Sequence, residues 1–462
     1  MRILLVIYDN DSYMQEFPMG TAYIASAIMQ AGHQVEIYHQ DIWHYPESHL
    51  TEKLNQKHYD VIGVSFVGGY YPYKKIKLIS ESINKSKNRP FYILGGYGPS
   101  PEPEYFLNIT GADAVVIGEG EITIKNLLKA LEDKTSLSTV KGIAYKEHDK
   151  VYINERQTVI DDIDSISWPA YDIFPVHLYR LLRMPNASNK DFVMQMLSGR
   201  GCPFKCTFCY RMDPGFRART AESIIEEIKF LVKDYRISYI SFQDDLLMSG
   251  KERTEYLCHQ LIKANLNIKW SCNGRLNFVS DNLISLMKNA GCVFINYGIE
   301  SLDNSVLKNM KKALTTDQIY SGVETTLNNG VSPGLNIIFG NIGDNRSTLE
   351  KGVEFLLRYN DGSQFRTIRP VTPYPGSELY YYAIDIGLLE GPNDFYEKKH
   401  LNSEFLTVNF TDLSDDEFHD CLLKANTVIA DNYYKSISKN IADQIHHLYT
   451  MKNINFRGFR QA

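Results

Sequence analysis

The spacing of hydrophobic and polar residues predicts an α/β domain over residues 1–155. Short runs of β-branched residues alternate with stretches in which apolar side chains recur every three or four positions, as at Ile24, Ala27 and Ile28. This alternation is typical of buried parallel strands joined by amphipathic helices. The predicted strands span residues 3–8, 34–38, 61–66, 91–94 and 114–117. We therefore expect a doubly wound, Rossmann-like sheet, closed by a hairpin at 141–154.

A second region, residues 193–390, repeats the strand–helix alternation with a longer period. Its predicted strands span residues 193–198, 239–244, 268–272, 294–299, 335–339 and 365–371. Between the first two strands, Ile224, Ile228 and Leu231 belong to a continuous apolar stripe, as in a helix that packs on a sheet. Six such units predict a partial (β/α)6 barrel of the TIM type, in which chemistry is expected at the carboxyl ends of the strands.

The remaining segments are predicted to be simpler. Residues 156–192 contain Pro169, Pro175 and Pro185 and are expected to form a meandering linker. Residues 391–462 are expected to form a small helical region, with helices over residues 417–431 and 435–449.

Composition excludes several classes of protein. The net charge of −6 gives no indication of a nucleic-acid partner, and no apolar run approaches the about 20 residues that a membrane span requires. Seven cysteines in 462 residues do not form a disulfide framework. We therefore expect reduced thiols, no nucleic-acid partner, no membrane span and a cytoplasmic location.

Three cysteines in the segment GCPFKCTFCY give the most specific chemical signal. Cys202, Cys206 and Cys209 have the spacing Cys-x-x-x-Cys-x-x-Cys, with Phe208 before the third. Three thiolates on one loop can bind three irons of a [4Fe–4S] cluster and leave the fourth iron open to the amino and carboxylate groups of S-adenosylmethionine. One electron from the cluster can then cleave this cofactor to a 5′-deoxyadenosyl radical. The alternative is a zinc site, but no fourth cysteine or histidine lies nearby.

Polar and charged residues collect where the predicted barrel strands end, which suits the groups that S-adenosylmethionine presents. Its ammonium needs carboxylates, its carboxylate a guanidinium or hydroxyl, its ribose an amide or carboxylate, and its adenine an apolar face. The candidates are Asp244, Asp245 and Glu300 for the ammonium, Arg275 or Ser301 for the carboxylate, Asn273 or Glu300 for the ribose, and Phe208 and Tyr374 for the adenine. The alternatives are a helix cap at Asp244–Asp245 and an ordinary ion pair at Arg275.

Long segments of the chain resemble one large enzyme family. FPMGTAYIASAIMQAGHQVEIYHQD, YDVIGVSF, ILGGYGPSPEPEYFL and ADAVVIGEGE are similar to a cobalamin-binding domain. SGRGCPFKCTFCY, ISFQDD, WSCNGR, YGIESLDNSVLKNMKK and TPYPGSELYYYAIDIGLL are similar to the radical S-adenosylmethionine (radical SAM) barrel that follows it. The resemblance extends over nearly all of residues 1–390, and at residues 340–345 GNIGDN replaces the usual Gly-x-Pro-Gly-Glu-Thr.

The resemblance implies a cobalamin-dependent radical SAM enzyme of the class B methyltransferase type. It would use one S-adenosylmethionine as methyl donor and a second as radical source, to methylate an unactivated carbon of a small-molecule or peptide substrate. A flavodoxin or ferredoxin would supply electrons. The alternatives are a non-methylating oxidation, cyclisation or rearrangement, a non-catalytic cobalamin or iron–sulfur sensor, and a transfer-RNA methylthiotransferase. The last is disfavoured because the N-terminal half contains no cysteine for a second cluster.

The resemblance also implies where cobalamin binds. Glycines cluster after three successive predicted strands, where a parallel sheet binds its ligands and where backbone can approach a bulky group. The expected cobalamin contacts are Ser65, Gly95, Gly96, Gly118, Glu119 and Gly120. Members of the family often have Asp-x-His-x-x-Gly after the first strand, with the histidine as the lower ligand of cobalt. Here Asp9, Asp11 and Met14 stand at that place, so we expect cobalamin without a histidine ligand.

Overall fold

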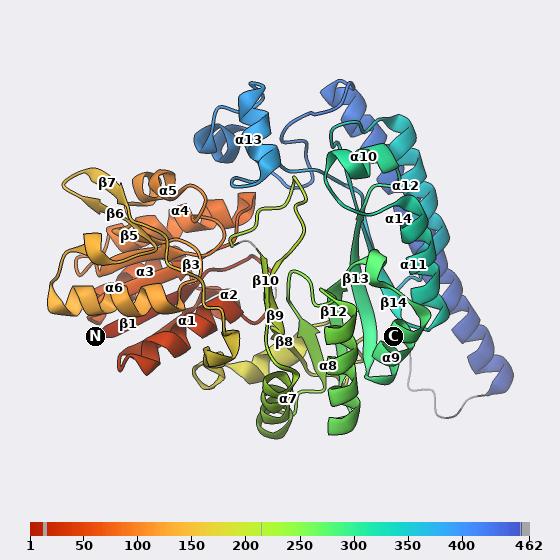
Figure 1. Cartoon of the computed structure of the whole chain (residues 1–462), viewed down its shortest axis with the longest axis horizontal. Coiled ribbons are helices and arrows are strands. Elements are labelled where there is room, and N and C mark those ends of the chain that lie inside the picture. Colours follow the sequence, from red (N-terminus) through yellow and green to blue (C-terminus); the bar gives the residue numbers. More distant parts are fainter. Residues whose placement is uncertain (13–15, 214, 453, 455–462) are drawn as a thin grey trace.

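The computed structural model describes residues 1–12, 16–213, 215–452 and 454, and it confirms the predicted α/β class (Figure 1). Met14 lies outside the described residues. Two sheets lie side by side, and a long C-terminal helix runs along the outer side of the second one (Figure 1). No described helix is both long enough and apolar enough to cross a membrane.

The first sheet has seven strands in the order β2-β1-β3-β4-β5-β6-β7. Its parallel strands are β1 (Arg2–Ile7), β2 (Gln34–His39), β3 (Val61–Ser65), β4 (Phe91–Gly95) and β5 (Ala114–Val116). The helices between and after them are α1 (Met19–Gln30), α2 (Gln40–Trp43), α3 (Glu47–Gln56), α4 (Tyr70–Asn84), α5 (Pro103–Thr110) and α6 (Glu121–Asp133). All five predicted strands are present. The strand order reverses between β1 and β3, which opens a crevice at their carboxyl ends.

The predicted hairpin closes this sheet. Strands β6 (Ile143–Glu147) and β7 (Lys150–Ile153) pair antiparallel with each other, and β6 pairs antiparallel with β5. The segment expected to be a meandering linker then contains three short 3-10 turns, at Ile163–Ser165, Tyr171–Ile173 and Val176–Leu181.

The second sheet has six parallel strands in the order β15-β14-β13-β12-β11-β8. They are β8 (Val193–Met196), β11 (Tyr239–Phe242), β12 (Lys269–Gly274), β13 (Cys292–Glu300), β14 (Ser332–Phe339) and β15 (Arg369–Pro370). The helices of this region are α7 (Ala221–Phe230), α8 (Lys251–Ala264), α9 (Asp281–Asn289), α10 (Asn304–Asn309), α11 (Thr316–Asn328), α12 (Arg346–Tyr359) and α13 (Glu378–Asp385). The partial barrel is confirmed.

The last barrel strand is much shorter than predicted, two residues in place of seven. The side chain of Asn426 explains where pairing stops. Its Oδ1 accepts from the Ile368 N–H at 2.8 Å, and its Nδ2 donates to the Ile368 carbonyl at 3.0 Å. Because both backbone groups are satisfied by a helix side chain, the segment before Arg369 is not extended as a strand.

The C-terminal region differs from the prediction of two helices. A single helix, α14 (Asp415–Met451), begins at a Ser414 capping box with Glu417 and contains no glycine or proline that would end it near residue 433. Only its first half packs against the barrel, through Phe418 and other buried apolar residues. The Phe418 ring stacks on Phe339 with 4.9 Å between ring centroids.

We expect Phe418→Ala to destabilise the fold, because this side chain is fully buried under the end of β14. The loss in free energy of unfolding should be about 3–5 kcal/mol, as for other buried aromatics truncated to alanine. Leu423→Ala on the same helix is the control, since Leu423 is 66% exposed. Denaturant unfolding measures both variants, and equal stability of the two would contradict the packing described here.

Candidate active site

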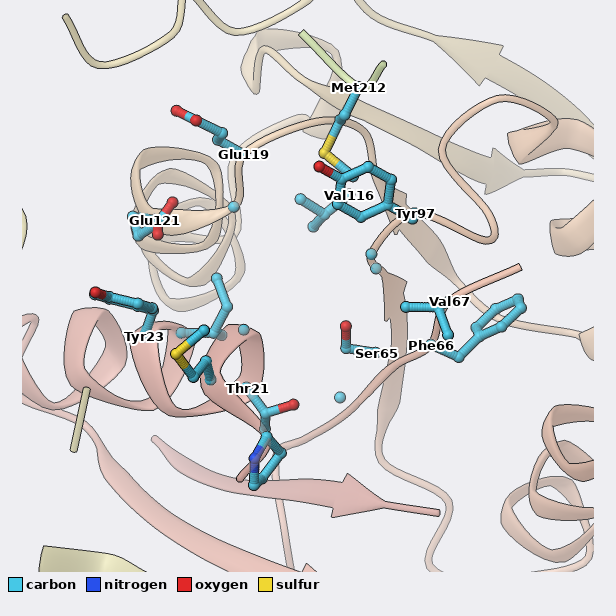
Figure 2. Close-up of a pocket in the computed structure, with 18 of the residues that line it drawn as sticks. Thr21, Tyr23, Ser65, Phe66, Val67, Tyr97, Val116, Glu119, Glu121 and Met212 are labelled. Atoms are coloured by element: carbon cyan, nitrogen blue, oxygen red, sulfur yellow. The ribbon is translucent and has the colours of Figure 1, made fainter. Parts of the chain in front are cut away.

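A cavity of about 550 Å³ lies between the first sheet and the rim of the barrel. The first sheet contributes the carboxyl ends of β3 and β4 and the loop after β5, while the barrel contributes the Gly199–Gly201 segment and the end of β11. Figure 2 shows Ser65, Val67, Tyr97 and Glu119 around this cavity. All six residues predicted to contact cobalamin line it: Ser65, Gly95, Gly96, Gly118, Glu119 and Gly120. Their role as cobalamin contacts stays a prediction.

Glycine is required where the β4 end borders the cavity. Gly96 has a φ of +94°, and a Cβ there would lie 2.7 Å from the Phe66 carbonyl oxygen and from Ser65 Oγ. Ser100 joins this turn to the next one, because its Oγ donates to the Gly96 carbonyl at 2.7 Å and accepts from the Gly118 N–H at 3.3 Å. The two glycine turns therefore form one wall of exposed backbone, which fits a large ligand that presents amides and a phosphate.

Among the described residues that line the cavity, there is no histidine. His39, the last residue of β2, and His44, which follows α2, are engaged elsewhere. His39 is buried with its Nε2 2.7 Å from Tyr179 Oη, and burial lowers its pKa to about 4. His44 Nδ1 lies 3.1 Å from Asp9 Oδ1. This arrangement supports the expected cobalamin without a histidine ligand.

Four charged residues connect the two halves of the cavity. Arg217 Nη2 lies 2.5 Å from Glu119 Oε1, and Arg200 Nη2 lies 2.6 Å from Glu121 Oε1. Arg200 Nη1 is also 3.4 Å from Glu119 Oε1. Burial alone would raise the pKa of Glu119, but the hydrogen bond from Arg217 and the charge of Arg200 outweigh it and lower the pKa. Glu119 therefore contacts the barrel directly, in addition to lining the cavity.

The three cysteines lie in a hairpin that the hydrophobic pattern did not predict. Strands β9 (Gly199–Cys202) and β10 (Gly215–Ala218) pair antiparallel, and the cysteine loop connects them. Two main-chain bonds fix its centre. The Thr207 N–H donates to the Met310 carbonyl at 3.0 Å, and the Leu379 N–H donates to the Thr207 carbonyl at 2.8 Å. The loop is thus held by the barrel on two sides.

The three thiols are free, and Cys209 is exposed. Desolvation, with the nearby charges of Cys206 and Asp245, raises the pKa of Cys202 above its ordinary value and that of Cys209 to about 12. Without a cation the Cys202 and Cys209 thiols are therefore protonated at neutral pH, and binding iron must release their protons. In the described part of the chain, no three His, Cys, Asp or Glu side chains gather closely enough to hold one metal ion.

Of the residues predicted to bind S-adenosylmethionine, only Asp244 and Asp245 border the cavity. Asp244 is buried, and its Oδ1 accepts from the Ser198 N–H at 2.6 Å and the Gly199 N–H at 3.1 Å. Burial raises its pKa to about 6, against the opposing hydrogen bonds from Ser198 and the charge of Arg253. These contacts hold the start of β9. Asp245 is exposed and accepts no hydrogen bond from the described residues, so its carboxylate is available to a ligand.

Arg275 and Glu300 are also engaged within the protein. The Arg275 guanidinium stacks on Phe204 of the cysteine loop, with Cζ 3.5 Å from the ring centroid, and it donates to the Lys312 carbonyl. Lys312 Nζ in turn lies 2.8 Å from Glu300 Oε1, and both side chains are buried. Glu300 has a φ of +69°, a strained conformation that is common at functional sites.

The remaining candidates are more dispersed. Phe208 lies in the cysteine loop, 5.8 Å from Lys312 Nζ to the ring centroid. Ser301 Oγ accepts from the Asp303 N–H at 3.2 Å. Asn273 Nδ2 donates to the Asp244 carbonyl at 2.8 Å, and Tyr374 packs against His400 with 5.2 Å between centroids. The roles of all eight residues stay predictions.

Neither periodicity nor motif spacing indicates a functional role for Arg200, Arg217 or Lys312. Each pairs with a carboxylate that is distant in the chain, from 12 residues for Lys312 to 98 for Arg217. The position of Arg200, two residues before Cys202, was the only available indication.

Comparisons with known proteins agree with this geometry. The model of the Radical SAM superfamily matches residues 196–356, and that of the B12 binding domain matches residues 7–128. An uncharacterized methyltransferase of Pyrococcus horikoshii is 30% identical over 401 residues, which cover 84% of each chain. An anaerobic magnesium-protoporphyrin IX monomethyl ester cyclase of Rubrivivax gelatinosus is 25% identical over 374 residues, 79% of this chain and 65% of the relative.

Among solved structures, the radical S-adenosylmethionine methyltransferase TsrM of Kitasatospora setae, with cobalamin and a [4Fe–4S] cluster bound, has a similar fold. The TM-score is 0.67 at 15% identity, with 85% of this chain and 76% of that chain covered. This protein therefore belongs to the radical SAM superfamily and has a B12 binding domain before the radical SAM domain. It is an enzyme that combines a radical SAM domain with a B12 binding domain, as the sequence predicts.

Replacing Cys202, Cys206 and Cys209 together by alanine should abolish binding of the about four irons and four sulfides of one cluster. The main-chain bonds of the loop do not involve the thiols, so the fold should persist. Iron and sulfide analysis after anaerobic reconstitution checks this. Cys421→Ala, which removes a partly exposed thiol on α14, is the control and should bind iron normally. Full iron content in the triple variant, or zinc in active iron-free protein, would disprove the assignment.

Electron paramagnetic resonance of the cobalt(II) form should show no nitrogen superhyperfine splitting. This follows because no histidine lines the cavity among the described residues and because we expect the dimethylbenzimidazole tail of cobalamin to be detached and extended along the glycine turns. Added imidazole is the control and should introduce the splitting. A nitrogen pattern in the untreated protein would contradict a cavity without a nitrogen ligand.

Proposed function

We propose that this enzyme methylates an unactivated carbon of a small-molecule or peptide substrate. The observation that carries the proposal is the cavity between the two sheets, which the glycine turns of the B12 binding domain border on one side and the hairpin of the cysteine loop borders on the other. A methyl carrier and a radical source that share one cavity can act on the same substrate atom. The P. horikoshii relative, which is named a methyltransferase, supports the same activity.

The residues of this chain position the reactants. Cys202, Cys206 and Cys209 are the proposed cluster ligands, and Asp245 is the proposed partner of the methionyl ammonium at the cavity edge. When bound, the cluster and S-adenosylmethionine supply a 5′-deoxyadenosyl radical, and cobalamin carries the methyl group. Phe66, with its neighbours in the cavity wall, provides an apolar surface that excludes water from a reactive radical.

The supply of electrons and the cellular location are part of the proposal. A flavodoxin or ferredoxin is the proposed electron donor, because the cluster must be reduced by one electron for each radical formed. The cytoplasm is the proposed location, since free thiols and an iron–sulfur cluster require a reducing compartment.

A radical oxidation or cyclisation without methyl transfer is the second candidate. The R. gelatinosus relative, which is named a cyclase, favours it, because its resemblance extends over 79% of this chain. Both reactions begin with the same radical, so they differ only in whether a methyl group enters the product.

Anaerobic reactions with dithionite, methyl-labelled S-adenosylmethionine and pooled candidate substrates should yield both 5′-deoxyadenosine and S-adenosylhomocysteine. The two products report radical formation and methyl donation, and mass spectrometry should find the label in a new compound. The triple cysteine variant is the control and should form no 5′-deoxyadenosine. A wild-type reaction that consumes substrate and yields 5′-deoxyadenosine without S-adenosylhomocysteine would favour the second candidate instead.

A further inference from the structure

A chain of amide side chains crosses the inner face of the barrel, outside the cavity described above. Asn296 Nδ2 on β13 donates to Asn273 Oδ1 on β12 at 3.0 Å, and Asn336 Nδ2 on β14 donates to Asn296 Oδ1 at 2.9 Å. Arg366 lies at the end of this chain. Its Nη2 is 2.9 Å from Asn296 Oδ1, and its Nη1 is 2.5 Å from Asn336 Oδ1.

Part of this inner face is accessible to solvent at Asn296, although Phe294 and Glu300 on the same face of β13 are buried. The outer face of the sheet is covered by helices (Figure 1). Along β13, Tyr297 and Ile299 are fully buried, while the alternating position Asn296 is only half-buried. Asn336 on β14 and Arg366 are also half-buried. The alternation of a strand therefore places these polar groups where a ligand in the barrel can reach them.

A glycine in β14 makes room for the guanidinium. A Cβ at Gly334 would lie 2.5 Å from Asn296 Oδ1 and 2.7 Å from Arg366 Nη2. Any side chain at this position would push the arginine away from the amides. The local sequence thus permits a close approach that ordinary strand residues would prevent.

The positive charge of Arg366 has no counter-ion among the described residues. Its hydrogen-bond acceptors are two neutral amide oxygens, and its Nε is buried without a partner. Burial and the charge of Arg369 lower its pKa to about 10, which leaves it protonated at neutral pH. A partly buried cation without a carboxylate nearby is unfavourable, and an anionic ligand would remove that cost.

Most of the unused hydrogen-bonding capacity next to the guanidinium consists of donors, besides one acceptor position on Asn336 Oδ1. Arginine can only donate, so Asn296 and Asn336 must present their oxygens to it. Asn336 uses both of its amide hydrogens, for Asn296 Oδ1 and for the Tyr297 carbonyl at 3.1 Å. Two terminal N–H groups of Arg366 and one of Asn296 remain for a ligand by this count, apart from the buried Nε–H. Such a set of donors matches the oxygens of a carboxylate or phosphate.

We propose that Arg366 and Asn296 bind an acidic group, a carboxylate or a phosphate, of the substrate inside the barrel. The inference rests on the proposed function, because it assigns a substrate class to the same enzyme. The carboxylate of S-adenosylmethionine is not the expected occupant. The cysteines follow β8 at one edge of the six-stranded sheet, whereas Arg366 precedes β15 at the opposite edge. Asn273, the first amide of the chain, donates to the Asp244 carbonyl. The chain therefore connects the proposed site at Arg366 with the barrel rim that borders the cavity.

The first test measures anion binding without any turnover. Melting temperatures of the full-length protein with its cofactors bound are compared in sodium acetate, sodium phosphate and sodium chloride of equal ionic strength. We expect acetate or phosphate to raise the wild-type value above that in chloride, and the more effective of the two identifies a carboxylate or a phosphate. Arg366→Gln should weaken the effective anion by about tenfold, the size expected for a lost charged hydrogen bond. Arg366→Lys keeps the charge but not the planar guanidinium, so its anion binding should be weaker than that of the wild type and stronger than that of Arg366→Gln.

Arg369→Gln is the matched control, because Arg369 is exposed and paired with Glu404 at 2.9 Å. It loses the same charge three residues away and should respond to anions like the wild type. An equal anion response in wild type and Arg366→Gln would overturn the proposal. So would a response abolished equally by Arg369→Gln, which would indicate general charge screening.

A second measurement separates this inference from the proposed function. Substrate-independent formation of 5′-deoxyadenosine should be the same in wild type and Arg366→Gln, with an unchanged dependence on S-adenosylmethionine concentration. A weaker affinity for S-adenosylmethionine in the variant would overturn the proposal, because the anion would then belong to the cofactor. If the wild type forms no 5′-deoxyadenosine, the proposed function fails, while the melting temperatures still decide whether Arg366 binds an anion.

Discussion

The ion pairs between Glu119, Glu121, Arg200 and Arg217 determine how the two sheets of this protein meet. The carboxylates lie at the start of α6. Arg200 lies on β9, the strand that ends at Cys202, and Arg217 lies on its partner strand β10. Buried charges are tolerated only when they are paired, so these contacts penalise any other alignment of the two halves. The distance between the glycine turns and the cysteine loop is therefore set by these ion pairs together with apolar packing, since Ile7, Phe17 and Ala22 of the first half belong to the same hydrophobic core as the barrel.

The rim of the barrel is arranged mainly to support that loop. Asp244 holds the backbone where β9 begins, and Arg275 stacks on Phe204 between the first two cysteines. Both residues had been expected to touch S-adenosylmethionine. Their contacts in the structure connect them to the loop, their contact with the cofactor stays a prediction, and Asp245 keeps a carboxylate free at the cavity edge. Of two neighbouring carboxylates in the segment QDD, Asp244 thus supports the loop, and Asp245 is the one available to a ligand.

Periodicity predicts the strands well, because burial on both faces of a parallel sheet imposes long apolar runs. All predicted strands of the first sheet are present. The sixth barrel strand is shorter than predicted, because the Asn426 side chain bonds to the Ile368 backbone in place of a neighbouring strand. The cysteine hairpin was missed because its four-residue strands have no apolar alternation. The residues that line the cavity could be predicted where their position depends on local sequence, as for Gly96 at the end of β4. The pairing of Glu119 with Arg217 and the contacts of Arg366 depend on distant residues, and one sequence gives no indication of them.

The loop that contains Cys202, Cys206 and Cys209 is held in place by main-chain bonds at Thr207 and by the stacking of Arg275 on Phe204. Thr207 bonds to Met310 and Leu379 without help from any thiol, so these two anchors of the loop do not require iron. Cys209 is exposed to solvent, so the outer corner of the loop is open to a delivering protein. We expect these anchors to persist in the iron-free protein, so that a cluster can be inserted after folding. The iron-free protein would be a folded acceptor in the cell and could be matured again after oxidative loss of its cluster.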